Sequence, residues 1–302
     1  MNSEKNKKTI LIGPTGFLGP AFLRADPSIT AVGRSDLPVG LTNKLVKISS
    51  DLDFSPLDEL EFQDVIFLIG SSDHKILNAH STMAIEKNVL ALSTFLQYLK
   101  KSDRRVNKII NFTTMLQYDS SKMNIPCDEN QPRNPYVNNY IMSKFISELI
   151  TEQYRDTFPI IDIRISNVYG PTSLYRPDIV PSLIWQLLET GEASVWNMSP
   201  KRDFIFVDDI VRGLLACALK GKPGESYNLA SGVDTTILEL AKEIIEFTGS
   251  KSKIVYKDLP KDDPHRRKPD ISLAIKKLNW IPKYDLDYGL MQTIKYFKEI
   301  SN

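Results

Sequence analysis

Cysteine is scarce in this 302-residue sequence, long hydrophobic runs are missing, and neither sign of charge predominates. The two cysteines, Cys127 and Cys217, lie far apart, which excludes a disulfide framework and a cysteine metal cluster. No run approaches the roughly 18 apolar residues that cross a bilayer, so we expect no membrane segment. With 38 Lys+Arg against 37 Asp+Glu, the formal charge of +1 gives no reason to expect nucleic acid as a partner.

The first residues also lack the features of a secretory signal. Residues 1–8 are polar and charged and lead straight into a short apolar run, without an apolar core or a small-residue cleavage site. We therefore expect a cytoplasmic protein with two reduced thiols. An apolar fraction of 42% and a charged fraction of 25% are ordinary for a globular chain, and the length suits two domains or one large domain with an added lobe.

Short apolar runs alternate with longer amphipathic segments in the first half of the chain. The runs predicted as strands cover residues 9–12, 29–32, 45–48, 65–69, 106–112 and 160–165. The helices predicted between them cover residues 17–25, 84–99 and 139–154. Strands that are apolar throughout and separated by helices predict an α/β fold, a doubly wound parallel Rossmann sheet covered on both faces.

A glycine-rich loop follows the first predicted strand and opens the first predicted helix. It reads Gly13-Pro14-Thr15-Gly16-Phe17-Leu18-Gly19. Three glycines at this spacing allow a tight turn, close approach of the backbone to a pyrophosphate, and close packing of helix on strand. The order strand, loop, helix near the N-terminus therefore predicts a dinucleotide site.

The residues that leave the second strand bear on the choice of dinucleotide. An acid here suits the ribose hydroxyl of NAD, whereas a cation suits the 2′-phosphate of NADP. The strand ends in Arg34 and Ser35, which together can hold a phosphate, and Asp36 follows. We favour NADP as the cofactor, and NAD, held by Asp36, is the alternative.

Tyr140 and Lys144 lie four residues apart on a predicted helix and so share one face. A phenol with a pKa near 10 needs a shift of roughly three units, about 4 kcal/mol, to work near neutrality. One ammonium about 4 Å away supplies that order of energy at an effective dielectric near 20. Thr113 and Thr114 directly follow the predicted strand 106–112. They therefore lie at the carboxyl end of this strand, and ligands bind at these strand ends in parallel sheets.

With these motifs in this order, the sequence resembles the extended short-chain dehydrogenase/reductase family, in particular its NAD(P)-dependent nucleotide-sugar epimerases, dehydratases and reductases. The resemblance runs through nearly the whole chain. The further motifs that carry it are Asp51-Leu52, Asn88-Val89, Asn167-Val168-Tyr169-Gly170-Pro171, Arg202-Asp203-Phe204-Ile205-Phe206-Val207-Asp208-Asp209, Tyr227-Asn228-Leu229-Ala230-Ser231-Gly232 and the tail 262–270 with Arg266-Arg267-Lys268-Pro269.

The resemblance implies a role for each matching residue. It implies that Tyr140 exchanges a proton with the sugar, that Lys144 lowers the pKa of that phenol and binds the nicotinamide ribose, and that Thr114 bonds the reacting sugar oxygen. Asp51 and Leu52 resemble the adenine contact. The cofactor set is thus Gly13, Thr15, Gly16, Phe17, Leu18, Gly19, Arg34, Ser35, Asp51, Leu52, Tyr140 and Lys144. A nucleoside-diphosphate sugar would be anchored by Asn167, Arg202 and Arg267, and the two arginines suit a diphosphate.

The sequence departs from the family directly after Thr114. Dehydratases of the family carry an Asp-Glu pair there and decarboxylases a Glu two residues on, whereas this chain has Met115 and Leu116. Neither side chain transfers a proton. The favoured function is therefore NADPH-dependent reduction of a nucleotide-linked 4-keto sugar, with a 4-epimerase retaining NAD as the alternative. A 4,6-dehydratase or decarboxylase ranks lower, and a non-catalytic binding protein lowest.

The same resemblance suggests how the chain is divided and assembled. We predict an NAD(P)-binding Rossmann domain in residues 1–170, to which 203–232 return, and a smaller C-terminal substrate-binding lobe formed mainly by 171–202 and 233–302. Pairing through the two long helices implies a homodimer. His74 and His80 have no Cys or acid cluster at ligand spacing, so we predict no metal site.

Overall fold

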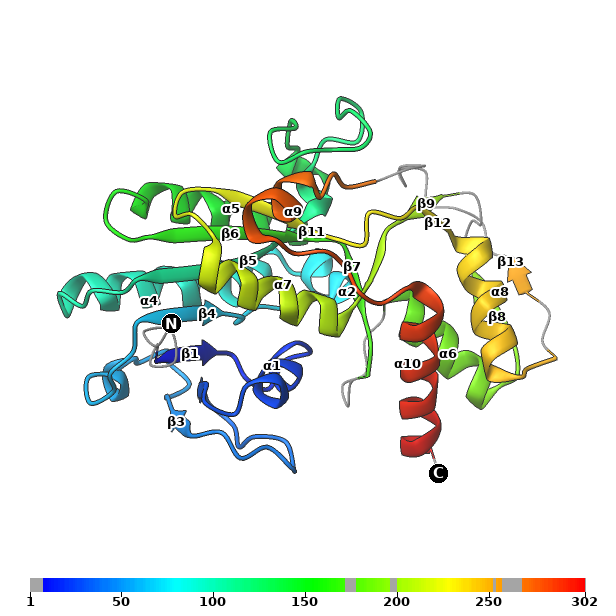
Figure 1. Ribbon diagram of the computed structural model, residues 1–302, viewed down its shortest axis with the longest axis horizontal. Coiled ribbons are helices and arrows are strands. Elements are labelled where there is room, and N and C mark those ends of the chain that lie inside the picture. Colours follow the sequence, from blue (N-terminus) through cyan, green and yellow to red (C-terminus); the bar gives the residue numbers. More distant parts are fainter. Residues whose placement is uncertain (1–7, 172–177, 196–199, 252–253, 257–267, 302) are drawn as a thin grey trace. The chain divides into compact units, whose positions relative to one another are not determined.

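The computed structural model describes residues 8–171, 178–195, 200–251, 254–256 and 268–301 (Figure 1). The chain divides into two compact units. Unit 1 comprises Met1–Gln117, Asn134–Arg164 and Val211–Tyr227, and unit 2 comprises Tyr118–Arg133, Ile165–Ile210 and Asn228–Asn302. The predicted division at residue 170 stays a prediction about domains.

A parallel sheet of seven strands, in the order β11-β6-β5-β4-β1-β2-β3, organises the fold. Its strands are β1 (Thr9–Ile12), β2 (Thr30–Gly33), β3 (Leu45–Lys47), β4 (Asp64–Phe67), β5 (Lys108–Thr114), β6 (Ile160–Ile165) and β11 (Ser226–Leu229). The strand order reverses direction at β1: β2 and β3 lie on one side of β1, and β4 and β5 lie on its other side. The predicted doubly wound parallel sheet is confirmed, and strands β1 to β6 begin and end within a few residues of the six predicted runs.

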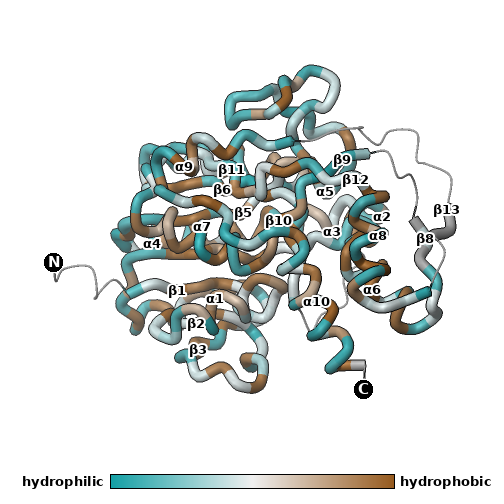
Figure 2. Tube along the Cα trace, turned by 45° about the vertical axis from the view of Figure 1, so that its right-hand side comes forward, coloured by the Kyte–Doolittle hydropathy of each residue, from teal (hydrophilic) through white to brown (hydrophobic). Residues whose placement is uncertain are grey.

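Both faces of this sheet are buried, which explains why its strands are apolar throughout. Successive side chains of a strand point to opposite faces. In β1, Ile10 and Ile12 point to one face and Leu11 to the other, and all three are buried. Figure 2 shows the same feature as hydrophobic stretches of the chain along β1 and β2.

The helices and short turns of unit 1 connect these strands. They are α1 (Gly19–Ala25), η1 (Ser55–Leu57), α2 (His74–Ala79), α3 (Ser81–Ile85), η2 (Glu86–Leu90), α4 (Ala91–Lys101), η3 (Met115–Gln117), η4 (Pro135–Val137), α5 (Asn139–Tyr154) and most of α7 (Val207–Lys220). The predicted helix 84–99 is interrupted, because η2 is a π-turn between α3 and α4. Such a turn inserts an extra residue and redirects the side chains around it.

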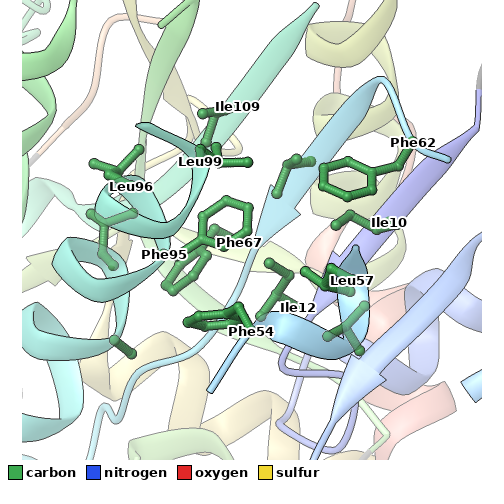
Figure 3. Close-up of a cluster of buried hydrophobic side chains, with 14 of the residues drawn as sticks. Ile10, Ile12, Phe54, Leu57, Phe62, Phe67, Phe95, Leu96, Leu99 and Ile109 are labelled. Carbon is green, nitrogen blue, oxygen red and sulfur yellow. The ribbon is translucent and has the colours of Figure 1, made fainter. Parts of the chain in front are cut away.

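An apolar core of unit 1 lies between one face of the sheet and α4 (Figure 3). Phe95 of α4 is fully buried and packs edge-on against Phe54, with ring centroids 5.2 Å apart. Its ring also meets that of Phe67 at 5.7 Å. Leu96 and Leu99 complete the stripe that α4 buries. This stripe follows the helical period, which is why the sequence predicts the helix.

The described residues of unit 2 form three short ladders and several helices. The ladders pair β7 (Asn167–Tyr169) with β10 (Phe204–Phe206), β9 (Lys201–Arg202) with β12 (Thr235–Thr236), and β8 (Ala193–Val195) with β13 (Ile254–Tyr256). The helices are α6 (Ile179–Glu189), α8 (Ile237–Thr248), α9 (Ser272–Leu278) and α10 (Leu286–Ser301). Helix α8 is bounded by a capping box of Thr236 and Glu239 and by Gly249, whose φ of 74° favours glycine.

No helix in the described part of the chain is both long enough and apolar enough to cross a membrane.

Candidate active site

Two glycines of the loop between β1 and α1 are required by the fold itself. Gly13 has a φ of +92° and donates its backbone N–H to Val32 O at 3.0 Å. A Cβ at Gly13 would lie 2.8 Å from Ile69 N, and one at Gly19 would lie 2.1 Å from Pro14 O. Side chains at either position would therefore push adjacent backbone segments apart.

Gly16 differs, because the protein leaves space beside it. It is exposed, and the nearest described atom to a Cβ built there is Gly13 O at an ordinary 3.8 Å. The residue that caps α1, Leu18, supplies no side-chain hydrogen bond. A loop with open space over a glycine and backbone groups at its rim fits a dinucleotide pyrophosphate. Thr15 and Phe17 are half-buried, whereas Leu18 is buried.

The residues after β2 are well placed to meet an added phosphate. Arg34 and Ser35 are exposed directly after the last residue of the strand. The Arg34 guanidinium makes no hydrogen bond or ion pair with any residue that the structure describes. Asp36, by contrast, lies 2.7 Å from Lys47 Nζ at the end of the adjacent strand β3. The cation is thus available here, while the carboxylate already has a partner.

The predicted adenine contact lies after β3. Asp51 is exposed and accepts a hydrogen bond from Ser49 Oγ. Leu52 adopts a φ of 63°, unusual for a leucine, and packs against the apolar core beneath α4. Its backbone N–H donates to Ser49 O at 3.4 Å and so closes a turn of four residues.

Three predicted catalytic residues lie within unit 1 and are buried. Helix α5 begins at an Asn138 cap, whose side chain accepts the N–H of Ile141 at 2.9 Å, and Tyr140 and Lys144 lie on its first turns. The ammonium of Lys144 donates to Phe112 O, 3.1 Å away, near the carboxyl end of β5. Thr114 ends that strand, and its hydroxyl accepts the N–H of Leu116 at 3.2 Å.

Lys144 lies in an unusually enclosed place for an ammonium. A Cβ built on Gly70 would be 3.1 Å from Lys144 Nζ and 2.9 Å from Asn88 Oδ1, so a side chain at this position would crowd the ends of both polar side chains. Burial lowers the pKa of Lys144 to about 8, while the negative charge of Glu148 acts to raise it. The group is therefore charged at neutral pH and close to its own titration.

Asn88 is a residue to which the sequence assigns no role. Its Oδ1 accepts the N–H of Ser71 at 2.7 Å, and its Nδ2 donates to Ser143 Oγ at 2.9 Å. Its side chain thus connects the segment after β4 to α5, and the π-turn η2 carries it. The Asn88-Val89 motif was the feature of the sequence that could have drawn attention to this residue.

His74 was likewise missed, because a lone histidine carries no pattern. It begins α2, and its ring lies 4.2 Å from the Tyr140 ring, centroid to centroid, at an angle of 60°. Asn78, on the same helix, accepts the backbone N–H of Tyr140 at 3.1 Å. Helix α2 therefore packs directly on Tyr140, the predicted catalytic tyrosine, and His80 lies at the other end of α2.

The predicted substrate residues belong to unit 2. Asn167 lies on β7 and donates its side-chain N–H to Asp203 O at 2.8 Å. Arg202 lies on β9, almost fully buried, and donates to Lys201 O at 2.9 Å. Arg267 lies outside the described residues. Their role in binding a substrate stays a prediction.

Asp203 joins three of the sequence motifs inside unit 2. Its buried carboxylate accepts bonds from Ser166 Oγ at 2.5 Å, from Ser231 N and Oγ at 2.9 and 2.8 Å, and from Gly232 N at 2.6 Å. Burial raises the pKa of this carboxyl, and the four hydrogen bonds oppose the rise. The motifs around 166, 203 and 231 are therefore one hydrogen-bonded structure.

The sequence profile of the NAD dependent epimerase/dehydratase family matches residues 10–230. The chain belongs to this family of enzymes. The match spans the glycine loop, the Tyr140/Lys144 helix and the 202–209 segment, so the resemblance to this family is confirmed.

Curated relatives include enzymes of several activities. The chain is 32% identical over 203 residues to dTDP-D-glucose 4,6-dehydratase of Mus musculus, covering 64% of the chain but only 56% of that enzyme. It is 26% identical over 321 residues to a probable GDP-L-fucose synthase of Oryza sativa, covering 98% and 94%. It is 28% identical over 327 residues to UDP-N-acetyl-alpha-D-glucosaminuronate decarboxylase of Bacillus cytotoxicus, covering 98% and 99%.

Solved structures agree with the fold. UDP-glucose 4-epimerase of Thermotoga maritima, crystallised with UDP-glucose, superposes with a TM-score of 0.87 at 24% identity, covering 98% of this chain and all of that one. dTDP-glucose 4,6-dehydratase of Streptomyces venezuelae, crystallised with NAD, superposes with a TM-score of 0.83 at 21% identity, covering 97% of each. Enzymes of different activity thus share this fold, and the activity has to be argued from the site.

Proposed function

We propose that this chain reduces a nucleotide-linked 4-keto sugar, with NADPH as the hydride source and Tyr140 as the proton donor. One observation carries the proposal, namely the side chains that follow Thr114. Met115 is buried and Leu116 half-buried, and neither exchanges a proton. Eliminating water needs a further acid and base, whereas hydride transfer to a ketone needs a single proton donor.

Two carboxylates lie near the residues that follow Thr114, one in the sequence and one in space. Both are poor substitutes for the acid that the elimination of water needs. Asp119, the next along the chain, accepts bonds from Ser121 Oγ at 2.6 Å and Ser121 N at 3.0 Å, which hold its pKa below the usual value. Burial alone would raise the pKa of Glu148, but the charge of Arg164 and several hydrogen bonds keep it below its ordinary range. Both are bases already bonded to donors.

A bound nicotinamide dinucleotide supplies the hydride. Tyr140 gives its phenolic proton to the sugar oxygen as the ketone becomes an alcohol. The buried ammonium of Lys144 favours the phenolate that this leaves, because opposite charges attract strongly in a site of low dielectric. Thr114 holds the sugar oxygen through its hydroxyl, and Gly16 admits the pyrophosphate of the cofactor to the loop.

The tyrosine is tested by a conservative substitution. Tyr140→Phe should lower kcat at least 100-fold, while the dissociation constant for NADPH stays within about twofold, since the loop and Arg34 are unchanged. Tyr136→Phe is the matched control, because Tyr136 lies on η4 just before the helix and is 83% exposed. Full activity of Tyr140→Phe on a panel of nucleotide sugars would refute the mechanism.

The preference for NADPH rests on the residues after β2. Arg34 is free of described partners, whereas Asp36 is paired with Lys47. Arg34→Ala should raise the KM for NADPH about 10- to 100-fold and leave the KM for NADH nearly unchanged. Asp36→Ala, two residues on, is the control. Equal effects of Arg34→Ala on both cofactors would remove the case for NADPH.

A 4-epimerase that retains NAD is the second candidate, and the same side chains after Thr114 favour it. Epimerisation through a transient ketone also needs no elimination acid. Purified protein that carries NAD and interconverts two sugar nucleotides without added reductant would select this function over the first.

We propose further that a nucleoside-diphosphate sugar is anchored by Asn167, Arg202 and Arg267, and that the protein is a homodimer paired through α5 and the helix that contains η2. Exposed apolar side chains support the dimer, since Leu90 is 50% exposed and Leu149 43% exposed. Leu149→Lys should give monomers in sedimentation, whereas Leu219→Lys, at a leucine of α7 that is 54% exposed, should not.

A further inference from the structure

Helix α5 buries a carboxylate that the proposed reaction does not use. Glu148 is fully buried and lies one helical turn beyond Lys144, as Lys144 lies one turn beyond Tyr140. A buried carboxylate is costly unless it is paired and hydrogen-bonded. Its partners therefore show what the position is built to hold.

Donors from three separate elements bind this carboxylate. Arg164 of β6 approaches with Nη2 2.7 Å from Oε2 and with Nε 3.1 Å from Oε1. Thr113 Oγ1 of β5 donates at 2.6 Å, and Gln117 Nε2 of η3 donates as well. Thr113 directly precedes Thr114, so the bonds of Glu148 connect α5 to both sides of the predicted catalytic threonine.

The charged groups near Glu148 come from α5 and from β6. On α5 the group is Lys144, and on β6 the groups are Arg164 and Asp162. The residues facing it from β5 and η3, Thr113 and Gln117, are neutral. Among these groups, Glu148 is the one whose charge offsets the burial of the Lys144 ammonium.

We propose that Glu148 is a positioning residue for the reaction: held by Arg164, Thr113 and Gln117, its carboxylate places a negative charge one helical turn from Lys144 and fixes α5 against the strand end that carries Thr114. The inference rests on the proposed function of Tyr140 and Lys144. It assigns to one side chain both the charge state of the ammonium and the alignment of the helix with β5.

A merely structural ion pair would behave differently. Replacing both members of a buried pair by neutral residues is often close to neutral for stability, because desolvation cancels much of the attraction. If Glu148 only stabilised the fold, its removal together with Arg164 would leave the pH dependence of catalysis unchanged. The positioning role requires that this dependence move.

The test compares kcat against pH for Glu148→Gln and for the wild type. Without the carboxylate, Lys144 loses its proton more easily, so the alkaline limb of the profile should move down by roughly one pH unit. We expect kcat at its optimum to fall about 10- to 100-fold, with the KM for the nucleotide sugar little changed. An unmoved limb would overturn the proposal.

Asp162→Asn is the matched control, because Asp162 is a second fully buried carboxylate beneath α5 whose charge does not act on Lys144. It should leave the alkaline limb in place. Since Glu148→Gln leaves Arg164 without its counter-charge and can prevent folding, Glu148→Gln with Arg164→Met is the second variant. The limb of this double variant should move in the same direction, and an unmoved limb would again refute the role.

A readout without substrate separates this inference from the proposed function. Phenolate absorbance of the wild type, minus that of Tyr140→Phe, reports ionisation of Tyr140 alone. In the Glu148→Gln background this ionisation should move to higher pH, because a neutral Lys144 no longer favours the phenolate. Inactivity on every nucleotide sugar would refute the proposed function, whereas an unmoved phenolate titration would refute the role of Glu148.

Discussion

Helices α4 and α5 contrast in what they bury within unit 1. Helix α4 buries an apolar stripe with Phe95 and Leu96 at its centre. Helix α5 instead buries polar groups along its length, and the hydroxyls of Ser143, Ser147 and Thr151 donate to the carbonyls of Tyr140, Lys144 and Glu148 at 2.7–2.8 Å. One helix stabilises the fold, and the other holds charges inside it at a cost in stability.

The polar layer continues into the sheet. Asp162 of β6 accepts a bond from Asn111 of β5 at 2.8 Å, its two carboxyl oxygens lie 3.0 and 2.9 Å from Thr151 Oγ1, and Arg155 lies 3.2 Å away. Hydrogen bonds of this kind make the burial tolerable but rarely favourable. The contrast between the two helices is therefore open to measurement, through stability for α4 and through pH for α5.

The largest expected effect is on the apolar side. Phe95→Ala should lower the free energy of unfolding by about 3–5 kcal/mol, because the ring is fully buried against Phe54 and Phe67. Denaturant titration measures this, and kcat of the protein that remains folded should be unchanged. Gln97→Ala, at an exposed position of the same helix, should stay within about 0.5 kcal/mol of the wild type.

The second effect is a pH dependence of stability that comes from Asp162. Burial and the negative charge of Glu148 raise the pKa of this carboxyl from 3.8 to about 7. Between these values the folded protein holds a proton that the unfolded chain has lost. Stability should therefore fall as pH rises from about 4 to 7, by up to about 4 kcal/mol, and stay level above that. Asp162→Asn should flatten this part of the curve, and a variant curve parallel to the wild type would contradict the assignment.

Lys144 should change stability with pH in the opposite direction from Asp162. Its pKa in the folded protein is about 8, below the ordinary 10.5, so the buried ammonium costs about 3 kcal/mol at pH 7. Lys144→Met should be inactive yet more stable below pH 8, and the gain should disappear as pH rises to 10.5. Thermal and denaturant unfolding across this range measure it. A Lys144→Met variant that is less stable than the wild type at pH 7 would contradict this prediction.

The smallest effect is expected at the ring that packs on Tyr140. His74→Ala should lower kcat about tenfold, since the phenol loses a contact 4.2 Å away. His74→Phe keeps an aromatic ring there and should restore most of the rate. If His74→Phe is as slow as His74→Ala, the imidazole contributes by its nitrogens and not by packing.

These two helices also show what the sequence can predict. The stripe of α4 repeats with the helical period, so the helix, the sheet and the α/β class follow from pattern alone. The glycine loop and the pair Tyr140/Lys144 are found by spacing. Glu148 and Asp162 are not, because an isolated acid in a helix or strand is ordinarily an exposed residue.

Other parts of the site depend on contacts between distant segments. Asn88 and His74 act through Ser143 and Tyr140, more than fifty residues later, and no local pattern carries such a pairing. The pairing of Asp36 with Lys47, which leaves Arg34 available, likewise needs the register of two strands. The sequence supplies the candidates, and the fold selects among them.

The π-turn ahead of α4 implies an unusual sensitivity to chain length. Five residues, Glu86–Leu90, form this turn, so the segments before and after it are out of phase by one position. Deleting a single residue there would restore a regular helix and rotate everything beyond it by about 100°. Either Asn88 or the apolar stripe of α4 around Phe95 would then face solvent. The segment should therefore be more sensitive to a change of length than to substitution.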